Sequence, residues 1–258
     1  MTHRTDTGSM WQVLYWPGRA GQGATLYFPP MDWLSLRKRL GGPVGSMGGR
    51  RRAERARWLT ETFPDLAQMS VIDLGGSIVT WQRAPVRPKH VHVVNMQPSR
   101  FDMPEWAEFD LGDACALPPD IAGRRYDLVF SNSVIEHVGG HERRERFADS
   151  VHQLSDAHWV QTPYRYCPVE PHWMAPGAQF LPVAGRVQVV RRWPLSFRRG
   201  QPRETAVRAV LGIELLDRTQ LRYYFPGSLI RTEWALGLPK SLIAYRTGRG
   251  DVTPSQAP

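Results

Sequence analysis

Two histidines are the candidates for acid–base chemistry in this chain. His137 lies in the tripeptide Glu-His-Val, and His172 lies in Pro-His-Trp, two residues after Glu170. Imidazole titrates near neutral pH, so either side chain is suited to removing the proton of an acceptor hydroxyl. Glu170 is placed to orient His172, although the intervening proline works against that contact. A structural role stays open for both, His137 as a residue at a helix start and His172 as part of a proline-rich loop.

A second set of residues is suited to binding a nucleotide-like ligand. Its members follow four successive apolar runs, and glycine, amide, carboxylate and hydroxyl groups are all represented. Glycine lets the backbone turn sharply and approach a ligand closely, and a polar group after the second run is positioned for ribose hydroxyls. A carboxylate after the third run can accept a hydrogen bond from an adenine amino group. The set comprises Asp73, Gly75, Gly76, Asn95, Asp113, Ser131 and Asn132.

The elements that position these residues alternate between strands and connectors or helices. The strand-like runs cover residues 71–74, 90–95, 106–111, 126–131 and 158–161. Phe147, Val151 and Leu154 recur at helical spacing between the last two, and a helix at 217–224 and strands at 229–236 and 241–246 close the pattern. This alternation predicts an α/β fold with a doubly wound, mostly parallel sheet, in which ligands bind at the carboxyl ends of the strands.

The flanking and inserted segments predict additions to this sheet. Residues 1–69 read as an irregular and helical extension, with helices at 32–40 and 50–63. The second helix is rich in arginine, which indicates either a solvated face or a phosphate-contacting patch. Residues 163–216 hold seven prolines, many aromatics and clustered arginines, and we expect an irregular insertion on the acceptor side. Residues 248–258 are predicted to be a flexible tail, which makes 70–247 the main domain.

Composition sets broad limits on the setting and the partners. The 258 residues suit one elaborated domain, and the arginine-dominated composition is typical of a bacterial protein from a GC-rich genome. Cys115 and Cys167 have no metal-ligand spacing, so we expect metal-independent chemistry in a reducing cytoplasm. The net charge of +9 is compatible with nucleic acid, anionic lipid or an acidic small molecule, and peripheral membrane contact stays open.

Four stretches of the chain resemble the class I S-adenosylmethionine-dependent methyltransferases. They read VIDLGG, HVVNMQ, DLGDACALP and YDLVFSNSVIEHV, and the last resembles the small-molecule branch with the motif D-x-V-x-S-x-x-V-x-E-H-V. The resemblance covers about residues 70–162 and implies a Rossmann-like fold. It further implies that Asp73 anchors the glycine turn and that the donor S-adenosyl-L-methionine is held by Gly75, Gly76, Asn95 (ribose), Met96 (adenine face), Asp113, Ala114 (adenine edge), Ser131 and Asn132.

The chain departs from the family pattern at two places. Ser77 and Ile78 stand where further glycines are usual, and Asn95 stands where an acidic residue is usual, so we expect modest donor affinity. The predicted function is methyl transfer to a small molecule, most simply a hydroxyl of a sugar, a lipid-linked compound or another secondary metabolite.

The sequence also bears on three other functions. An RNA or other nucleic-acid methyltransferase fits the charge, but the Asp/Asn-Pro-Pro-aromatic motif of base-amino methylation is missing after the fourth strand. A non-catalytic binding module with a vestigial donor pocket also stays open. An NAD-dependent oxidoreductase does not fit, because the glycine loop lacks G-x-G-x-x-G.

Overall fold

The computed structural model describes residues 47–248 of the chain. The predicted helix at 32–40, the irregular start and residues 249–258 of the predicted tail lie outside this range.

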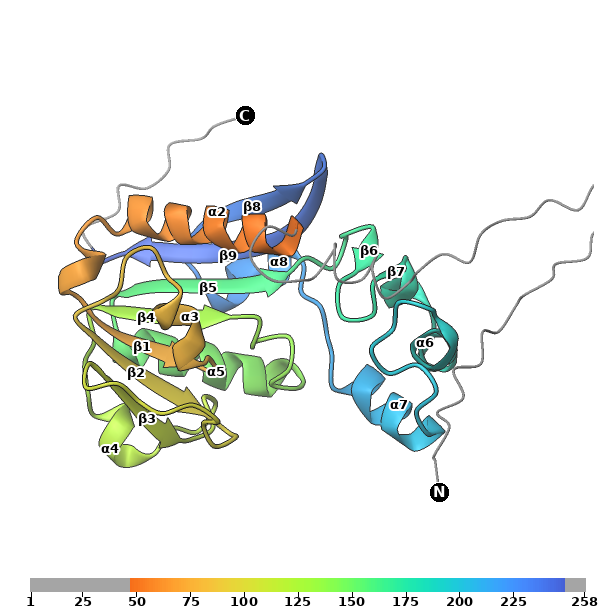
Figure 1. Cartoon of the computed structure of the whole chain (residues 1–258), viewed down its shortest axis with the longest axis horizontal. Helices are drawn as coiled ribbons and strands as arrows, with labels where there is room; N and C mark the ends of the chain where they lie inside the picture. Colours follow the sequence, from red (N-terminus) through yellow and green to blue (C-terminus); the bar gives the residue numbers. More distant parts are fainter. Residues whose placement is uncertain (1–46, 249–258) are drawn as a thin grey trace, which may run out of the picture.

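A seven-stranded sheet forms the centre of the molecule (Figure 1). Its spatial order is β3-β2-β1-β4-β5-β9-β8, and β9 alone runs against the other strands. The strands are β1 (Ser70–Leu74), β2 (His90–Asn95), β3 (Ala107–Leu111), β4 (Leu128–Asn132), β5 (Ala157–Pro163), β8 (Leu229–Ala235) and β9 (Leu238–Thr247). The predicted doubly wound, mostly parallel sheet is confirmed.

Helices cover both faces of this sheet, and successive strand residues supply the two cores. In β1, Val71 packs under α2 (Met47–Thr62), η1 (Leu66–Gln68) and α3 (Ile78–Gln82), whereas Ile72 packs under α4 (Pro119–Ala122), α5 (His141–Leu154) and α8 (Arg218–Tyr224). This alternation is what a sheet buried on both faces requires. Because β1 to β4 run parallel, the loops at their carboxyl ends lie along one edge of the sheet.

Helix α2 and the residue that follows it pack on the sheet through large apolar side chains. Trp58, Leu59 and Phe63 belong to the same core as Trp81 of α3 and Trp159 of β5. The described part of the N-terminal extension therefore shares a core with the main domain.

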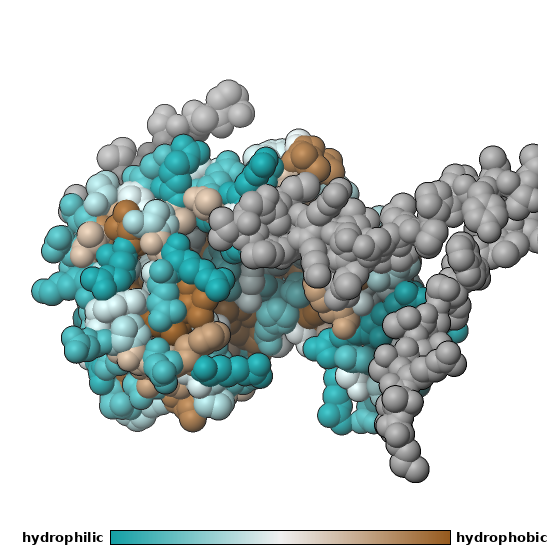
Figure 2. All heavy atoms as spheres, in the orientation of Figure 1, coloured by the Kyte–Doolittle hydropathy of each residue, from teal (hydrophilic) through white to brown (hydrophobic). Residues whose placement is uncertain are grey.

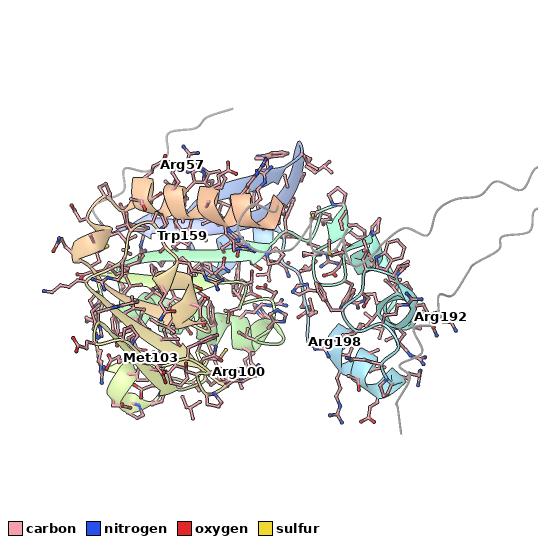
Figure 3. The ribbon with its side chains drawn as sticks, in the orientation of Figure 1. Arg57, Arg100, Met103, Trp159, Arg192 and Arg198 are labelled. Carbon is pink, nitrogen blue, oxygen red and sulfur yellow. The ribbon has the colours of Figure 1, made fainter. Side chains whose placement is uncertain are left out.

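The arginines of α2 are largely paired within the protein. Ion pairs join Arg51 to Glu54, Arg55 to Glu233 and Arg57 to Glu61, and Arg57 extends from the outer side of the helix (Figure 3). Arg51 and Arg57 therefore match a solvated face better than a phosphate patch, whereas Arg55 contacts the buried Glu233.

The insertion after β5 forms a lobe beside the sheet (Figure 1). It comprises β6 (Val169–Glu170), β7 (Ala175–Pro176), η2 (Ala178–Phe180), α6 (Val183–Arg192) and α7 (Arg203–Leu211). Trp173, Val187, Val190, Ala206 and Val210 form a core of its own. The prediction of an irregular insertion was therefore wrong, because its prolines include the residues just before α6 and α7, where proline starts a helix rather than breaking one.

The surface is mostly hydrophilic in the view of Figure 2, with an apolar patch at the tip of the β8–β9 hairpin. Trp234, Leu236 and Leu238 are exposed there. Within residues 47–248, no helix is both long and apolar enough to cross a lipid bilayer.

Candidate active site

The glycine loop after β1 is hydrogen-bonded to both neighbouring strands. The backbone N–H of Gly75 donates to the carbonyl of Val94 at 2.7 Å, at the end of β2. The Asn95 amide donates to the carbonyls of Gly75 and Gly76, at 3.0 and 2.9 Å. From the other neighbouring strand, β4, the buried Ser131 hydroxyl donates to the carbonyl of Leu74, the residue before Gly75, at 3.0 Å. The structure thus brings Gly75, Gly76, Asn95 and Ser131 together at one edge of the sheet.

Both glycines of this loop are required by the space around them. Gly75 has φ +76°, and a Cβ there would lie 2.6 Å from the side chain of Val134. A Cβ on Gly76 would lie 2.0 Å from the carboxylate of Asp73. Any side chain at these positions would displace the loop.

Asp73 lies beneath the loop, fully buried. Its Oδ2 accepts a hydrogen bond from the indole N–H of Trp81 at 2.9 Å, and Oδ1 has no partner in the described structure. Burial raises the pKa of Asp73 to about 7, with the indole bond working in the opposite direction. The side chain expected to anchor the turn is therefore packed directly against it.

A cavity of about 330 Å³ opens beside the loop and the end of β2. Its lining comprises Gly76, Ser77, Ile78, Val93, Asn95, Phe109 and residues 97–101. Arg100, labelled in Figure 3, is one of these residues. Met96 follows Asn95 with 70% of its surface exposed, so it is free to pack on a flat ligand.

The loop after β3 is attached to this edge through its first residue. The N–H of Gly112 donates to the carbonyl of Asn95 at 3.0 Å. The carboxylate of Asp113 accepts from Arg143 at 2.7 Å and from the backbone of Cys115 at 2.9 Å. Burial would raise the pKa of Asp113, but these hydrogen bonds outweigh it and hold that pKa below its ordinary value. Asp113 is thus an ionised, already paired group, and Ala114 beside it is buried.

The segment after β4 connects the glycine loop to the predicted histidines. Asn132, half-buried, ends the strand, and Ser133 adopts φ +59°, where its N–H and hydroxyl donate to Gln161 at 2.8 and 3.0 Å. The next residue, Val134, is the one against which Gly75 packs, and its carbonyl accepts from the N–H of His137 at 2.7 Å. One turn of chain therefore separates the glycine loop from His137.

The two candidate histidines lie side by side although 35 positions separate them in the sequence. Their ring centroids are 5.0 Å apart, with one ring edge-on to the other. Nδ1 of His172 contacts Glu170 at 2.7 Å, so the predicted orienting contact is confirmed despite the proline. Nδ1 of His137 faces the carbonyl of Gly212 at 3.2 Å, and partial burial lowers the pKa of this histidine.

Several residues of this region were not singled out from the sequence. Glu136, inside the quoted motif, is buried and accepts a hydrogen bond from Thr162 at 3.0 Å. Arg143 and Gln161 hold loops in place, and their types and spacing carry no signal of that role. Only the position of Glu136 beside His137 could have drawn attention beforehand.

A second cavity, of about 150 Å³, lies where the lobe meets the chain leading to α8. Its lining combines two arginines with two glutamates: Arg165, Glu170, Trp173, Gln179, Arg186, Ile213, Glu214 and Leu215. The Nε of Arg186 and the Oε1 of Gln179 are buried without a partner in the described part of the chain. The cavity has room for one polar or charged group rather than for a whole metabolite.

The strand order, the single reversed strand and the glycine loop after β1 define a Rossmann-like class I methyltransferase fold. No protein-family model and no curated protein sequence matches the chain.

Solved structures with a similar backbone path include the following three. Magnesium protoporphyrin IX methyltransferase from Synechocystis PCC 6803, with bound SAH, is 14% identical over 78% of this chain and 84% of its own, with a TM-score of 0.48. A protein from Bordetella parapertussis, described as a possible exported protein, is 15% identical over 77% and 68%, with a TM-score of 0.49. Human N-acetylserotonin methyltransferase in complex with SAM is 13% identical over 85% and 60%, with a TM-score of 0.43.

Proposed function

We propose that this protein transfers a methyl group from S-adenosyl-L-methionine to a small-molecule acceptor. The observation that carries the proposal is the edge formed by the ends of β1, β2 and β4, where residues predicted separately as donor ligands are bonded to one another. The cavity beside them lies at the carboxyl ends of the strands, where this fold binds nucleotides.

The donor's parts are assigned to residues along this edge. Gly75 and Gly76 have no Cβ to keep the methionine portion away from the loop, and Met96 packs on the adenine ring. Asp113 and Ala114 hold the adenine edge. Because the Asn95 amide is bonded to the loop, its Oδ1, which accepts from Gln97 at 3.1 Å, is the atom left for a ribose hydroxyl. The buried Ser131 hydroxyl supports the loop, and Asn132 is the residue nearer the sulfonium.

The reaction itself needs little beyond alignment and one proton acceptor. A sulfonium is a good leaving group, so lining up acceptor, methyl carbon and sulfur supplies much of the rate. Glu170 fixes the ring of His172 through Nδ1, which leaves Nε2 of that histidine to take the proton of an acceptor hydroxyl. His137 is the second candidate base.

The acceptor that we propose is a hydroxyl of a sugar, a lipid-linked compound or another secondary metabolite carrying an anionic group. Arg165 and Arg186 in the smaller cavity are suited to a phosphate or carboxylate, because the two glutamates of its lining, Glu170 and Glu214, are already bonded to His172 and Arg144. The exposed apolar tip of the β8–β9 hairpin is the surface that we assign to peripheral membrane contact, if the acceptor is lipid-linked.

Calorimetric titration with S-adenosyl-L-methionine tests the proposal directly. We expect micromolar binding to the wild type, and loss of that binding in Gly75→Val and Asp113→Ala. Gly140→Ala is the matched control, because φ is −60° there and no atom lies within 4 Å of its added Cβ. A folded wild type that fails to bind the donor would refute the proposal. Donor binding without methyl transfer to any hydroxylated acceptor would instead favour a vestigial binding module.

A further inference from the structure

Three side chains that can ligate a metal ion meet where the lobe joins the α/β body. Glu136 and His137 follow β4, and His172 comes from the turn between β6 and β7. One ligand atom of each lies within 4.8 Å of the other two. Oε1 of Glu136 is 3.9 Å from Nε2 of His137, whereas ligands of a tetrahedral ion are roughly 3.4 Å apart. The other separations are no more than 4.8 Å, so binding an ion requires side-chain rotations that draw the three atoms together.

Glu136 supplies an oxygen that lacks a partner. Its side chain is buried, and Oε2 accepts from Thr162, but Oε1 has no hydrogen-bond donor in the described structure. A buried carboxylate oxygen without a partner is costly. A cation held against Oε1 would remove that cost.

Both histidines already have the hydrogen bonds that metal-bound imidazoles use. The carbonyl of Gly212 can only accept, so Nδ1 of His137 carries the proton and Nε2 presents a lone pair. Glu170 plays the same part for His172, and its other oxygen is fixed by the N–H of Trp173 at 2.8 Å. A carbonyl and a carboxylate behind the ring are the usual outer partners of histidine ligands.

We propose that Glu136, His137 and His172 bind one divalent transition-metal ion, with Zn²⁺ as the best match to two imidazoles and a carboxylate. Three protein ligands leave at least one coordination position open for water or another oxygen. This site departs from the metal-independent chemistry predicted from the sequence, since its third ligand comes from the distant lobe. An ion there would also connect the lobe to the body.

The ion's effect on an acceptor is a separate step that rests on the proposed function. A hydroxyl bound at the open position would lose its proton more readily, because a divalent ion lowers the pKa of a bound oxygen acid. The histidines would then serve as ligands rather than as the base, and the proton released from the hydroxyl would pass to solvent water.

Cobalt titration of the full chain tests the metal site without measuring activity. The protein is purified without a histidine tag, treated with EDTA, and titrated with Co²⁺ while visible absorption is recorded. We expect one Co²⁺ per chain, with the bands of a four- or five-coordinate ion that Zn²⁺ displaces. Glu170→Gln should weaken binding about 10- to 100-fold, as losing an outer partner of a histidine ligand does. Glu136→Gln and His172→Ala, which remove ligands, should weaken it further.

The control is His90→Ala, since His90 is the first residue of β2 and lies at the end of the strand away from the site. Thermal unfolding in EDTA shows whether each variant folds, and Glu136→Gln keeps an oxygen for the bond from Thr162. Absence of bands in the wild type, or equal Co²⁺ affinity in all variants, would overturn the proposal. Donor titration in EDTA is independent, so a failure here and a failure of the donor site are distinguishable.

Discussion

Asn95 ends β2, and two roles are assigned to it: binding the ribose of the donor and holding the glycine loop. Replacing Asn95 by aspartate distinguishes between them. An acidic residue is usual there in the resembled family, and a charged acceptor would bind ribose hydroxyls more strongly. In this chain, however, the Asn95 amide donates to the carbonyls of Gly75 and Gly76. A carboxylate has no proton to donate to those carbonyls, so we expect Asn95→Asp to weaken donor binding.

The size of the effect follows from the two lost bonds and the new contacts. Each neutral hydrogen bond contributes about 1 kcal/mol net, and the repulsion between a carboxylate and two carbonyl oxygens adds about 1–2 kcal/mol. A total of about 3–4 kcal/mol corresponds to roughly 100- to 900-fold weaker binding, because the loop must be restored before the donor binds. Asn95→Ala loses only the bonds, so about 2 kcal/mol, or roughly 30-fold, is expected.

Calorimetric titration with S-adenosyl-L-methionine measures both variants, and urea unfolding checks that each is folded. Tighter binding by Asn95→Asp than by the wild type would refute the reasoning, since it would mean that the side chain faces the ribose instead of holding the loop.

Three further predictions concern buried polar groups. Arg55→Ala should lower the free energy of unfolding by about 2 kcal/mol, because the buried Glu233 then keeps only its 3.6 Å contact with Lys240. Urea unfolding measures this change, and the double variant with Glu233→Gln should recover part of the lost stability. Burial lowers the pKa of His158 to about 3 in the folded protein. As the pH falls below 6.5, this histidine is therefore protonated in the unfolded chain but not in the folded one, and the free energy of unfolding decreases. By pH 5 this loss is about 2 kcal/mol, and His158→Gln should flatten urea-unfolding stability between pH 5 and 6.5; an unchanged slope would contradict the assignment. Trp81→Phe removes the indole bond to Asp73 and should cost about 1–3 kcal/mol in thermal unfolding at pH 8, where the carboxylate is ionised, and less at pH 5.

The sheet could be predicted from the sequence because its strands are written as short apolar runs. The run at 90–95 coincides with β2, and the spacing of Phe147, Val151 and Leu154 matches the buried stripe of α5. The polar and glycine residues that follow these runs needed only the rule that parallel strands end at a common edge. The donor side of the site therefore followed from local patterns.

The lobe and the cluster around Glu136 could not be predicted in the same way. Pro182 and Pro202 look like helix breakers in isolation, and only their position before α6 and α7 shows that they start helices. The meeting of His137 with His172 depends on how the lobe docks, through contacts such as Glu214 N–H to the carbonyl of Glu136 at 2.9 Å. No spacing in the chain encodes that tertiary contact.

The separate core of the lobe has a consequence for how this protein can diverge. Residues such as Trp173, Val190 and Val210 share no cluster with the two cores that support the sheet. Substitutions among them can reshape the proposed acceptor side while the glycine loop and its supports stay intact. Under the proposed function, selection can therefore change the acceptor without rebuilding how the donor is held. An exchange of residues 165–215, which leaves Tyr164 and Leu216 in the core of the sheet, is a rational unit for a chimera.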